Sequence, residues 1–436
     1  MAGEEQKPES ILGASGVNCD AAAAYLIRCN TPDSACKLGI ESNYRALSSK
    51  ISYELGKVTE ENIRKLYGKK LNLSASQVDK QAECRLAYFL KYGLRAQERK
   101  AVSVDPAEFG TYVHAVLEQT ARDICDLGGF KSVSLQQTLE IAKKYSDLYT
   151  REHFSQLDSQ RITYLFQRNS HELMMVVEEL WNELQSSDFQ PVDFELAFGD
   201  GMTLPAIQIP GSEMPAQLRG FVDRVDSWQD GGRNYYRIVD YKTGRKDFDY
   251  CDVFNGLGLQ MLLYLFTLEQ TGHPQLGTHP KPAGVQYFPA RVPILATDGV
   301  LDDEAAAQER LSQWKRKGLI LNDDDVLFAM ENSENPVRLS CRRNKDGTLT
   351  GDVASREQFK LLSRYVFHLL AKMVGEIASG NVDPNPYTRG NSHNACQFCP
   401  YGMICHSAVV EGRRNYKTMS AQRFWDDIEK EMSNHD

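Results

Sequence analysis

The chain has 436 residues, 42% hydrophobic and 25% charged, which is ordinary for a soluble globular protein and enough for two or three domains or one large decorated domain. No apolar run approaches a membrane span and the polar N-terminus is no secretory signal, so we expect an intracellular protein with reduced thiols. The net charge of −9 argues against nucleic-acid binding, because proteins that bind nucleic acids are usually basic. The argument is weakened because the net charge is an average over the whole surface.

Three short basic runs interrupt this acidic average. They are Lys315-Arg316-Lys317, Arg342-Arg343 with Lys345, and Arg413-Arg414 with Lys417. A run of this length is typical of a solvated surface, and we interpret each of the three in this way.

The first 70 residues show helical patterns but no recognisable chemistry. An Ala-rich patch at 21–24 and helical periodicity at 40–68 predict helices there. Neither segment contains a cluster of residues that we can assign to catalysis or binding. We therefore predict a helical N-terminal segment, residues 1–70, of unclear role.

A clear helix start follows at Ser76, with Asp79 three residues later as a weak analogue of a capping box. The helix is expected to run through Cys84 to about Leu90. A glycine commonly ends a helix, so we expect this one to stop near Gly93.

A second helix is predicted to begin near Thr111, because apolar residues then recur at helical spacing. The apolar stripe consists of Val113, Val116, Leu117, Ala121 and Ile124. Residues 135–187 predict more helix, which ends before Pro191.

From residue 192 the periodicity becomes that of strands, since Phe194, Leu196 and Phe198 alternate. Residues 220–228 and 235–241 predict a β-hairpin around a Gly231-Gly232 turn. Downstream we predict, in chain order, a helix at 257–270, a strand at 284–289, helices at 301–317 and 355–379, and a loop at 381–395. There is no internal repeat, and no GxxxxGK[ST] motif that would indicate a P-loop motor.

The predicted hairpin carries the strongest chemical signal. Asp240 and Lys242 share one face of their strand because side chains alternate, and the hairpin brings Asp223 beside them. A divalent cation such as Mg²⁺ relieves the repulsion between two carboxylates, and it activates water for attack on a phosphodiester. Lys242 would orient that water and stabilise the charged transition state. The alternative is an exposed hairpin, but the apolar pair Ile238-Val239 directly before Asp240 argues against it.

The run Gly-x-x-Asp-Arg-x-Asp, followed by Asp-Tyr-Lys-Thr-Gly, resembles the RecB-type branch of the PD-(D/E)XK nucleases. The resemblance implies an α/β fold, in which a mixed central sheet of the restriction-endonuclease type is flanked by helices and carries helical insertions. It also implies that Asp223 and Asp240 bind Mg²⁺ or Mn²⁺, that Lys242 is the catalytic lysine, and that the Tyr241 carbonyl ligates the metal. Asp226 is not implied as a ligand.

Two further motifs of this branch occur in the right order. The segment around His114 resembles the helical motif whose histidine ligates the metal; taken alone, His114 is more simply a satisfied helix histidine. Glu118, one turn later, either orients His114 or is a plain surface residue. Gln260 and Tyr264 resemble the Gln-x-x-x-Tyr motif, which suits them to contact DNA or support the site; two polar residues near a core are the alternative.

The ten cysteines fall into two groups. Six are scattered along the chain, and we interpret them as buried or idle thiols. They are Cys19, Cys29, Cys36, Cys125, Cys251 and Cys341.

The other four cysteines predict a soft-ligand site. Cys396, Cys399 and Cys405 form C-x₂-C-x₅-C, and Cys84 stands far upstream. Zinc is one alternative, although zinc sites usually use two local pairs. The arrangement resembles the iron–sulfur nucleases of the same branch, above all the B subunit of AddAB-type helicase–nucleases, and this implies a [4Fe–4S] cluster held by these four residues as a staple.

We therefore predict three segments: residues 1–70, a nuclease domain at 71–410 closed by the cysteines, and a tail at 411–436. The resemblance implies a metal-dependent exonuclease on single-stranded DNA ends in double-strand break repair. It also implies a helicase partner, a bacterial cytoplasmic location and no membrane. The alternative is a non-catalytic iron–sulfur module that guides DNA strands for a partner. The helicase-like half of such a subunit is absent or reduced to part of residues 1–70, and segments 135–187 and 301–330 have no assigned role.

Overall fold

A computed structural model describes most of the chain. The described residues are 18–28, 32–51, 57–97, 106–154, 160–212, 214–277, 279–293, 302–334, 336–390, 393–405 and 412–434. They form two compact units, residues 1–57 and 58–436. Among the described helices, none is both long and apolar enough to cross a bilayer.

The first unit is a small cluster of three helices. They are α2 (Cys19–Arg28), α3 (Pro32–Lys37) and α4 (Glu41–Ile51). Its core is built mainly of small side chains, including Ala22, Ala23 and Ala35 around Leu26. Helix α2 contains the predicted alanine patch and α4 lies in the segment of helical periodicity, whereas α3 was not predicted. Helix α5 (Glu60–Tyr67) follows in the second unit, so this division differs by one helix from the predicted boundary at residue 70.

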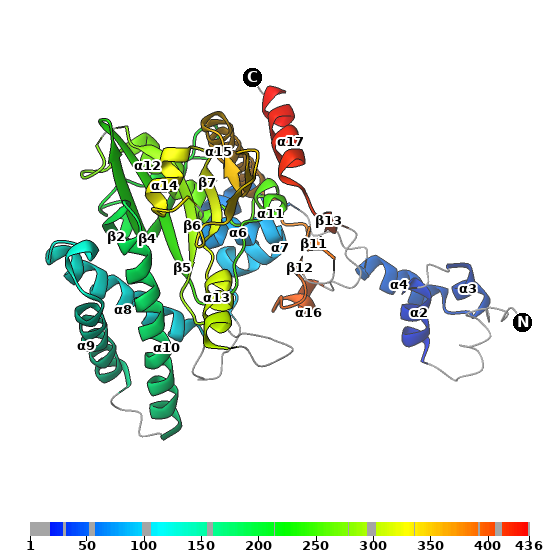
Figure 1. Cartoon of the computed structure of the whole chain (residues 1–436). Helices are drawn as coiled ribbons and strands as arrows, with labels where there is room; N and C mark the ends of the chain where they lie inside the picture. The colour runs from blue at the N-terminus through cyan, green and yellow to red at the C-terminus, as the bar shows by residue number, and fades with distance from the viewer. Residues whose placement is uncertain are drawn as a thin grey trace, which may run out of the picture. The chain divides into compact units, whose positions relative to one another are not determined.

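The second unit is built on an eight-stranded mixed sheet, in the order β1-β4-β5-β6-β7-β10, with β2 and β3 also paired to β4 (Figure 1). The strands are β1 (Leu71–Ser74), β2 (Gln190–Phe198), β3 (Ile207–Gln208), β4 (Ala216–Asp230), β5 (Arg233–Lys242), β6 (Lys281–Pro289), β7 (Lys317–Leu321) and β10 (Val353–Ala354). The parallel pairs are β1–β4, β5–β6 and β7–β10, and the remaining pairs are antiparallel. The predicted α/β class with a mixed central sheet is confirmed.

The predicted hairpin is present as β4 and β5. Asp230 pairs with Arg233, which leaves a two-residue turn at Gly231 and Gly232. Their φ angles are 52° and 81°, and two consecutive positive values are the geometry of a type I′ turn, which favours glycine. This turn sets the register that brings Asp223 next to β5.

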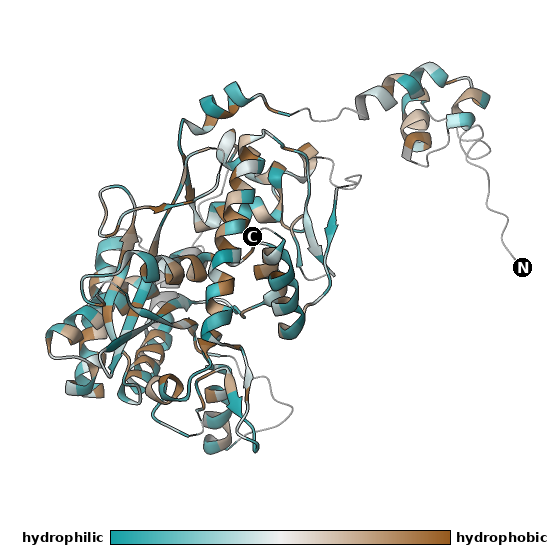
Figure 2. Ribbon diagram, turned by 90° about the horizontal axis from the view of Figure 1, so that it is seen from above, coloured by the Kyte–Doolittle hydropathy of each residue, from teal (hydrophilic) through white to brown (hydrophobic). Residues whose placement is uncertain are grey.

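Helices cover both faces of the sheet. On the first face lie α8 (Pro106–Asp126), α9 (Leu135–Phe154) and α10 (Gln160–Gln185). The apolar stripe predicted on α8 is fully buried there, in a first core that also contains Phe194, Val239, Tyr241 and Phe288 from the strands. Ribbons coloured by hydropathy show that the helices around the sheet carry both polar and apolar residues (Figure 2).

On the second face lie α6 (Ala75–Glu83), α12 (Gln260–Thr271), α15 (Arg356–Ala378) and α17 (Ala421–Ser433). They share a second core with β1 and β4 to β7, to which α17 contributes Phe424 and Ile428. Residues 421–433 of the predicted tail are therefore packed against the domain. Ile238 belongs to this second core while Val239 belongs to the first, so β5 alternates between the faces as expected of a strand.

The helix predicted from Ser76 to Leu90 is wrong in two details. Its N-cap is Ser74, whose side chain forms a full capping box with Gln77. The helix also breaks at Cys84, which has extended backbone angles, φ −168° and ψ 123°. The chain then continues as α7 (Arg85–Tyr88) and a π-helix, η1 (Phe89–Gly93).

The remaining elements are short connections. They are η2 (Phe130–Ser132), α11 (Tyr250–Phe254), α13 (Asp303–Gln313), α14 (Asp324–Met330), β8 (Cys341–Arg343), β9 (Leu349–Gly351), β11 (Tyr387–Arg389), β12 (His393–Asn394), α16 (Gly402–Cys405) and β13 (Arg414–Asn415). The helix predicted at 301–317 is shorter than expected, because Lys317 already starts β7. The predicted loop at 381–395 contains the two small strands β11 and β12.

Candidate active site

The hairpin brings the two predicted aspartates together. Arg224 pairs with Val239 across β4 and β5, so the neighbouring Asp223 comes next to Asp240. The backbone N–H of Tyr241 donates a hydrogen bond to Asp223 Oδ2 at 2.7 Å. This bond fixes the Asp223 carboxylate against the second strand.

Asp240 and Lys242 form an ion pair on the second face of the sheet. The Lys242 Nζ lies 2.5 Å from Asp240 Oδ2, and the Lys242 side chain is 33% exposed while that of Asp240 is 7% exposed. Within the described residues, this buried Oδ2 atom has no partner that meets the geometry of a hydrogen bond. A buried carboxylate needs a positive charge beside it, because a buried charge is otherwise costly, and here the Lys242 ammonium supplies that charge.

His114 lies on α8 and reaches the same place from the first face. Its Nε2 is 2.9 Å from the Tyr241 carbonyl oxygen, and its Nδ1 is 3.4 Å from Asp223 Oδ2. Burial lowers the pKa of His114, although the charge of Asp240 opposes this effect. A lowered pKa favours neutral imidazole, which is the form that binds metals.

Glu195, which the sequence analysis did not identify, completes the group. One ligand atom from each of His114, Glu195 and Asp223 can be chosen so that all three lie within 4.8 Å of one another. Glu195 lies on β2 with φ +47°, in the left-handed region that non-glycine residues rarely adopt. Phe194, Leu196 and Phe198 lie on a strand, β2, as predicted, but Phe194 packs in the first core and the other two pack in the second.

Burial, together with neighbouring carboxylates, determines the electrostatics of this group. Burial, and next the charge of Asp240, raise the pKa of Asp223 well above its usual range. Burial, and next the charge of Glu118, raise the pKa of Glu195. Such a site gains from a divalent cation, because the cation stabilises the ionised carboxylates. The donor set of carboxylates, one imidazole and one backbone carbonyl fits Mg²⁺ or Mn²⁺.

Gln260 and Tyr264 lie on α12, where Tyr264 is 3% exposed and its ring stacks on Phe198 with centroids 5.5 Å apart. The Tyr264 hydroxyl would lie only 1.8 Å from a Cβ placed on Gly220, so only glycine fits that position. Burial raises the pKa of Tyr264 to about 12, opposed by its hydrogen bond with Gln260. A buried tyrosine at this place supports the strand that carries Asp223, rather than presenting its ring to DNA.

Glu118 pairs with Arg122 rather than with His114. The Arg122 Nε donates to Glu118 Oε1 at 2.9 Å, one turn further along α8. Among the contacts of the described residues there is none between Glu118 and the His114 ring. The role of Glu118 therefore involves Arg122.

The four cysteines of the predicted soft-ligand site line one cavity. Cys84 forms its wall together with Cys396, Cys399 and Cys405, although Cys84 lies more than 300 residues away from them in sequence. Hydrogen bonds tie the two segments together around the cavity: the Arg85 N–H donates to Asn385 Oδ1 at 2.8 Å. Among the described residues, the cysteines form no disulfide.

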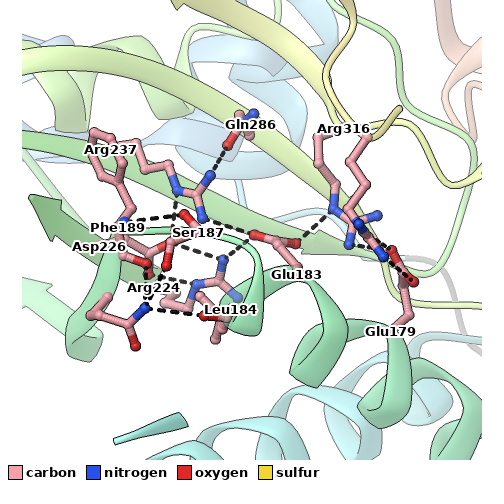
Figure 3. Close-up of polar contacts among 12 residues, drawn as sticks. Glu179, Glu183, Leu184, Ser187, Phe189, Arg224, Asp226, Arg237, Gln286 and Arg316 are labelled. Atoms are coloured by element: carbon pink, nitrogen blue, oxygen red, sulfur yellow. Dashed lines mark hydrogen bonds and ion pairs between the residues drawn. The ribbon is translucent and has the colours of Figure 1, made fainter. Parts of the chain in front are cut away.

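Behind the active site, on the first face, lies a buried network of charges (Figure 3). Glu183, from α10, is at its centre. Its carboxylate accepts from Arg224 at 3.0 Å, from Arg237 at 2.9 Å and from Arg316 at 2.8 Å, and these arginines are 0–2% exposed. The interpretation of Arg316 as part of a solvated basic run is therefore wrong.

Two more carboxylates balance these arginines. Asp226 Oδ2 accepts from Arg224 at 2.9 Å and from Arg237 at 2.8 Å, and Glu179 Oε1 accepts from Arg316 at 2.9 Å. These three arginines and three carboxylates form the centre of the network, which continues from Glu179 to Arg338 at 2.8 Å. It explains the second aspartate of the Asp-Arg-x-Asp motif as a structural residue and links α10 to the strands β4, β5 and β6, the last through Gln286.

The network also touches the active site. Arg224 Nη1 lies 3.4 Å from the Tyr241 hydroxyl, and its guanidinium is 5.7 Å from the Tyr241 ring centroid. The backbone of Tyr241 contacts both Asp223 and His114, as described above. Segments 135–187 and 301–330, which had no role in the sequence analysis, therefore contribute to the scaffold of the site through Glu183 and Arg316.

Comparison with known proteins agrees with this geometry. A family model described as the PD-(D/E)XK nuclease superfamily matches residues 72–406. The chain is 32% identical over 385 residues to the B subunit of the ATP-dependent helicase/deoxyribonuclease of Thermoanaerobacter sp. (strain X514), covering 85% of this chain and 33% of the relative. The B subunit of the same name from Clostridium novyi (strain NT) is 32% identical over 398 residues, covering 88% and 35%.

A third relative with this name, from Moorella thermoacetica, is 35% identical over 350 residues, covering 78% of this chain and 30% of its own length. The chain thus spans about a third of the length of the relatives it matches. The family match extends from β1 through the hairpin to the last cysteine of the cavity, and so includes every residue of the candidate site. By this match, the chain belongs to the PD-(D/E)XK nuclease superfamily.

Proposed function

We propose that this chain is a metal-dependent DNA nuclease, an exonuclease that hydrolyses phosphodiesters at single-stranded ends during double-strand break repair. The observation that carries the proposal is the group His114, Glu195 and Asp223, with ligand atoms within 4.8 Å, beside the Asp240–Lys242 pair. The names of the relatives, subunits of an ATP-dependent helicase/deoxyribonuclease, support a helicase partner.

The residues of the site have separate roles in this proposal. His114, Glu195, Asp223, Asp240 and the carbonyl of Tyr241 would hold Mg²⁺ or Mn²⁺, which supplies charge neutralisation and a water of lowered pKa when bound. Lys242, the partly exposed cation, orients the attacking water and stabilises negative charge on the scissile phosphate. Tyr264 and Gly220 fix the strand beneath them.

The direct test uses the purified chain with end-labelled single-stranded DNA and Mg²⁺. We expect shortening of the label-bearing strand that stops when EDTA is added. Binding of DNA without cleavage, in the presence of metal and a folded protein, would support the rival function of a non-catalytic module that guides strands. A second reaction with double-stranded ends tests the preference for single strands.

For His114 we expect a change in metal requirement. The substitution His114→Ala removes a ligand, so activity should need a higher Mg²⁺ or Mn²⁺ concentration, and added metal should restore part of it. His368→Ala is the matched control: its side chain is 25% exposed, close to the 28% of His114, but it lies on α15 and its Nε2 is 3.9 Å from Glu431 Oε1. The control should melt at a lower temperature with an unchanged metal titration. Identical metal titrations for the two variants would contradict the role of His114.

We further propose that Cys84, Cys396, Cys399 and Cys405 hold one [4Fe–4S] cluster as a structural staple. Their shared cavity supports this proposal, since four thiolates meet the ligand demand of such a cluster. A link between Cys84 and Cys396 closes a very long loop of the unfolded chain. By analogy with disulfides it would stabilise the fold by several kcal/mol, on the order of 4–5.

Replacing Cys399 with alanine should therefore remove the brown colour and lower the melting temperature, with a loss of activity that follows the loss of folded protein. Cys125→Ala is the control, because this half-buried thiol lies outside the cavity and should leave iron and sulfide unchanged. Iron and sulfide analysis of anaerobically purified protein checks the prediction. One equivalent of zinc without iron would replace the cluster by a zinc staple.

A further inference from the structure

Glu195 has a backbone conformation that needs support. Its φ of +47° is one of two positive values among the described residues other than glycine. For a side chain with a Cβ this conformation is strained, and it persists only where neighbouring groups hold it. The conformation matters for the proposed site because it turns the Glu195 carboxylate toward His114 and Asp223.

Side chains hold both backbone polar groups of Phe194, the residue before Glu195. The Phe194 N–H donates to Asp193 Oδ1 at 2.7 Å. The Phe194 carbonyl accepts a hydrogen bond from Arg122 Nη2 at 2.5 Å, and the Arg122 guanidinium lies 5.5 Å from the centroid of the Phe194 ring. The angle φ of Glu195 describes rotation relative to the peptide that contains the Phe194 carbonyl. Hydrogen bonding that holds the Phe194 carbonyl therefore restricts the direction of the Cα–Cβ bond of Glu195.

Arg122 is itself positioned by the helix that carries His114. His114, Glu118 and Arg122 follow at intervals of four residues on α8, which places them along one side of the helix. Glu118 accepts from Arg122 Nε at 2.9 Å and so orients the guanidinium toward β2. One face of α8 thus meets the site twice, directly through His114 and indirectly through Arg122.

We propose that Arg122 is a positioning residue of the metal site, which holds the Phe194 carbonyl so that Glu195 is directed at the metal. This inference rests on the proposed function, because it gives Glu195 the role of a ligand. Arg122 does not touch the metal or the DNA in this scheme. The charged donor on the carbonyl offsets the strain at the next residue, and Glu118 holds the donor in place.

The test measures Mn²⁺ binding by the whole chain without DNA, by the loss of the free Mn²⁺ electron-spin signal. Arg122→Ala should weaken Mn²⁺ binding about tenfold, as is typical for a residue that orients a ligand. Arg122→Lys should recover part of the affinity, since lysine can still donate to the carbonyl. Arg168→Ala is the matched control: Arg168 also pairs with a glutamate four residues on, Glu172, at 3.2 Å, but contacts no metal-site strand in the described residues. It should bind Mn²⁺ as the wild type does.

A double-mutant cycle separates positioning from general packing. In a Glu195→Gln background, Arg122→Ala should cause little further loss of Mn²⁺ affinity, because the group that it positions has lost its charge. Additive losses, or unchanged Mn²⁺ binding by Arg122→Ala with normal folding, would overturn the inference. Mn²⁺ binding by a wild-type chain that cleaves no DNA would instead overturn the nuclease proposal, and the same variants would still decide the role of Arg122.

Discussion

Replacing Lys242 with alanine is expected to slow DNA cleavage about 10²–10³-fold while the protein stays folded, because a positioned electrostatic stabiliser typically contributes this much. The side chain is one-third exposed, so its loss leaves no large cavity. Metal binding should remain, since no ligand is removed and the ammonium of Lys242 no longer competes with the metal for Asp240. Single-turnover cleavage of end-labelled DNA at saturating Mg²⁺ measures the effect.

Lys131→Ala is the control for this experiment. Lys131 also pairs with an aspartate, Asp188, at 2.8 Å, but it lies on η2, outside the hairpin. The Lys131→Ala variant should cleave DNA at the wild-type rate. If Lys242→Ala were to retain a rate within a few-fold of wild type, the lysine would not be the catalytic residue and the ion pair with Asp240 would be structural.

The largest loss of stability is expected for Glu183→Gln. Burial alone would raise the pKa of Glu183, but Arg316, Arg224 and Arg237 outweigh it and hold the pKa well below its usual range. Removing one charged partner from a buried network leaves the others uncompensated, which typically costs about 3–5 kcal/mol. The urea midpoint of unfolding should fall accordingly. The ionised Glu183 carboxylate stabilises the fold at pH values above the ordinary pKa of a carboxyl group. This stabilisation is lost in strong acid, as the pH falls through the pKa of Glu183 in the folded protein.

Glu172→Gln on the same helix gives the matched comparison. Glu172 pairs with Arg168 at 3.2 Å, with side chains 21% and 55% exposed. Such a surface pair contributes about 0.5 kcal/mol or less, so the midpoint should barely move. Equal midpoints for the two variants would show that the buried network is neutral for stability and that the chain relaxes around the missing charge.

The sequence was sufficient for the elements whose signal is local. The Gly231-Gly232 turn fixed the register of the hairpin, and from it the neighbourhood of Asp223 and Asp240 follows. The stripe on α8 predicted its buried face. In each case a short-range pattern determines the local geometry, so no information from distant parts of the chain is needed.

Glu195 and Arg316 were not predicted, for the same physical reason. Glu195 stands between apolar residues that alternate, so the pattern assigns it to solvent, and only its left-handed backbone redirects it. Arg316 lies between two lysines in a run that looks exposed, and only Glu179 and Glu183, more than 130 residues away, make its burial possible. The hydrophobic periodicity of a segment depends only on its local sequence. It therefore cannot predict a backbone conformation or a buried charge that depends on residues far away in the chain.

The charge balance behind the site limits how this chain can be shortened. Without α10, Arg224 and Arg237 would share Asp226 alone from this network, and Arg316 would lose both of its glutamates. Without the segment that carries Arg316, the glutamates of α10 would lose their common cation. The two segments are separated by more than a hundred residues, yet together with β4 and β5 they form one electrically neutral unit. A reduced nuclease that lacked both segments would therefore still need a carboxylate in place of Glu183 beside Arg224 and Arg237, or apolar side chains in place of the whole set of buried charges.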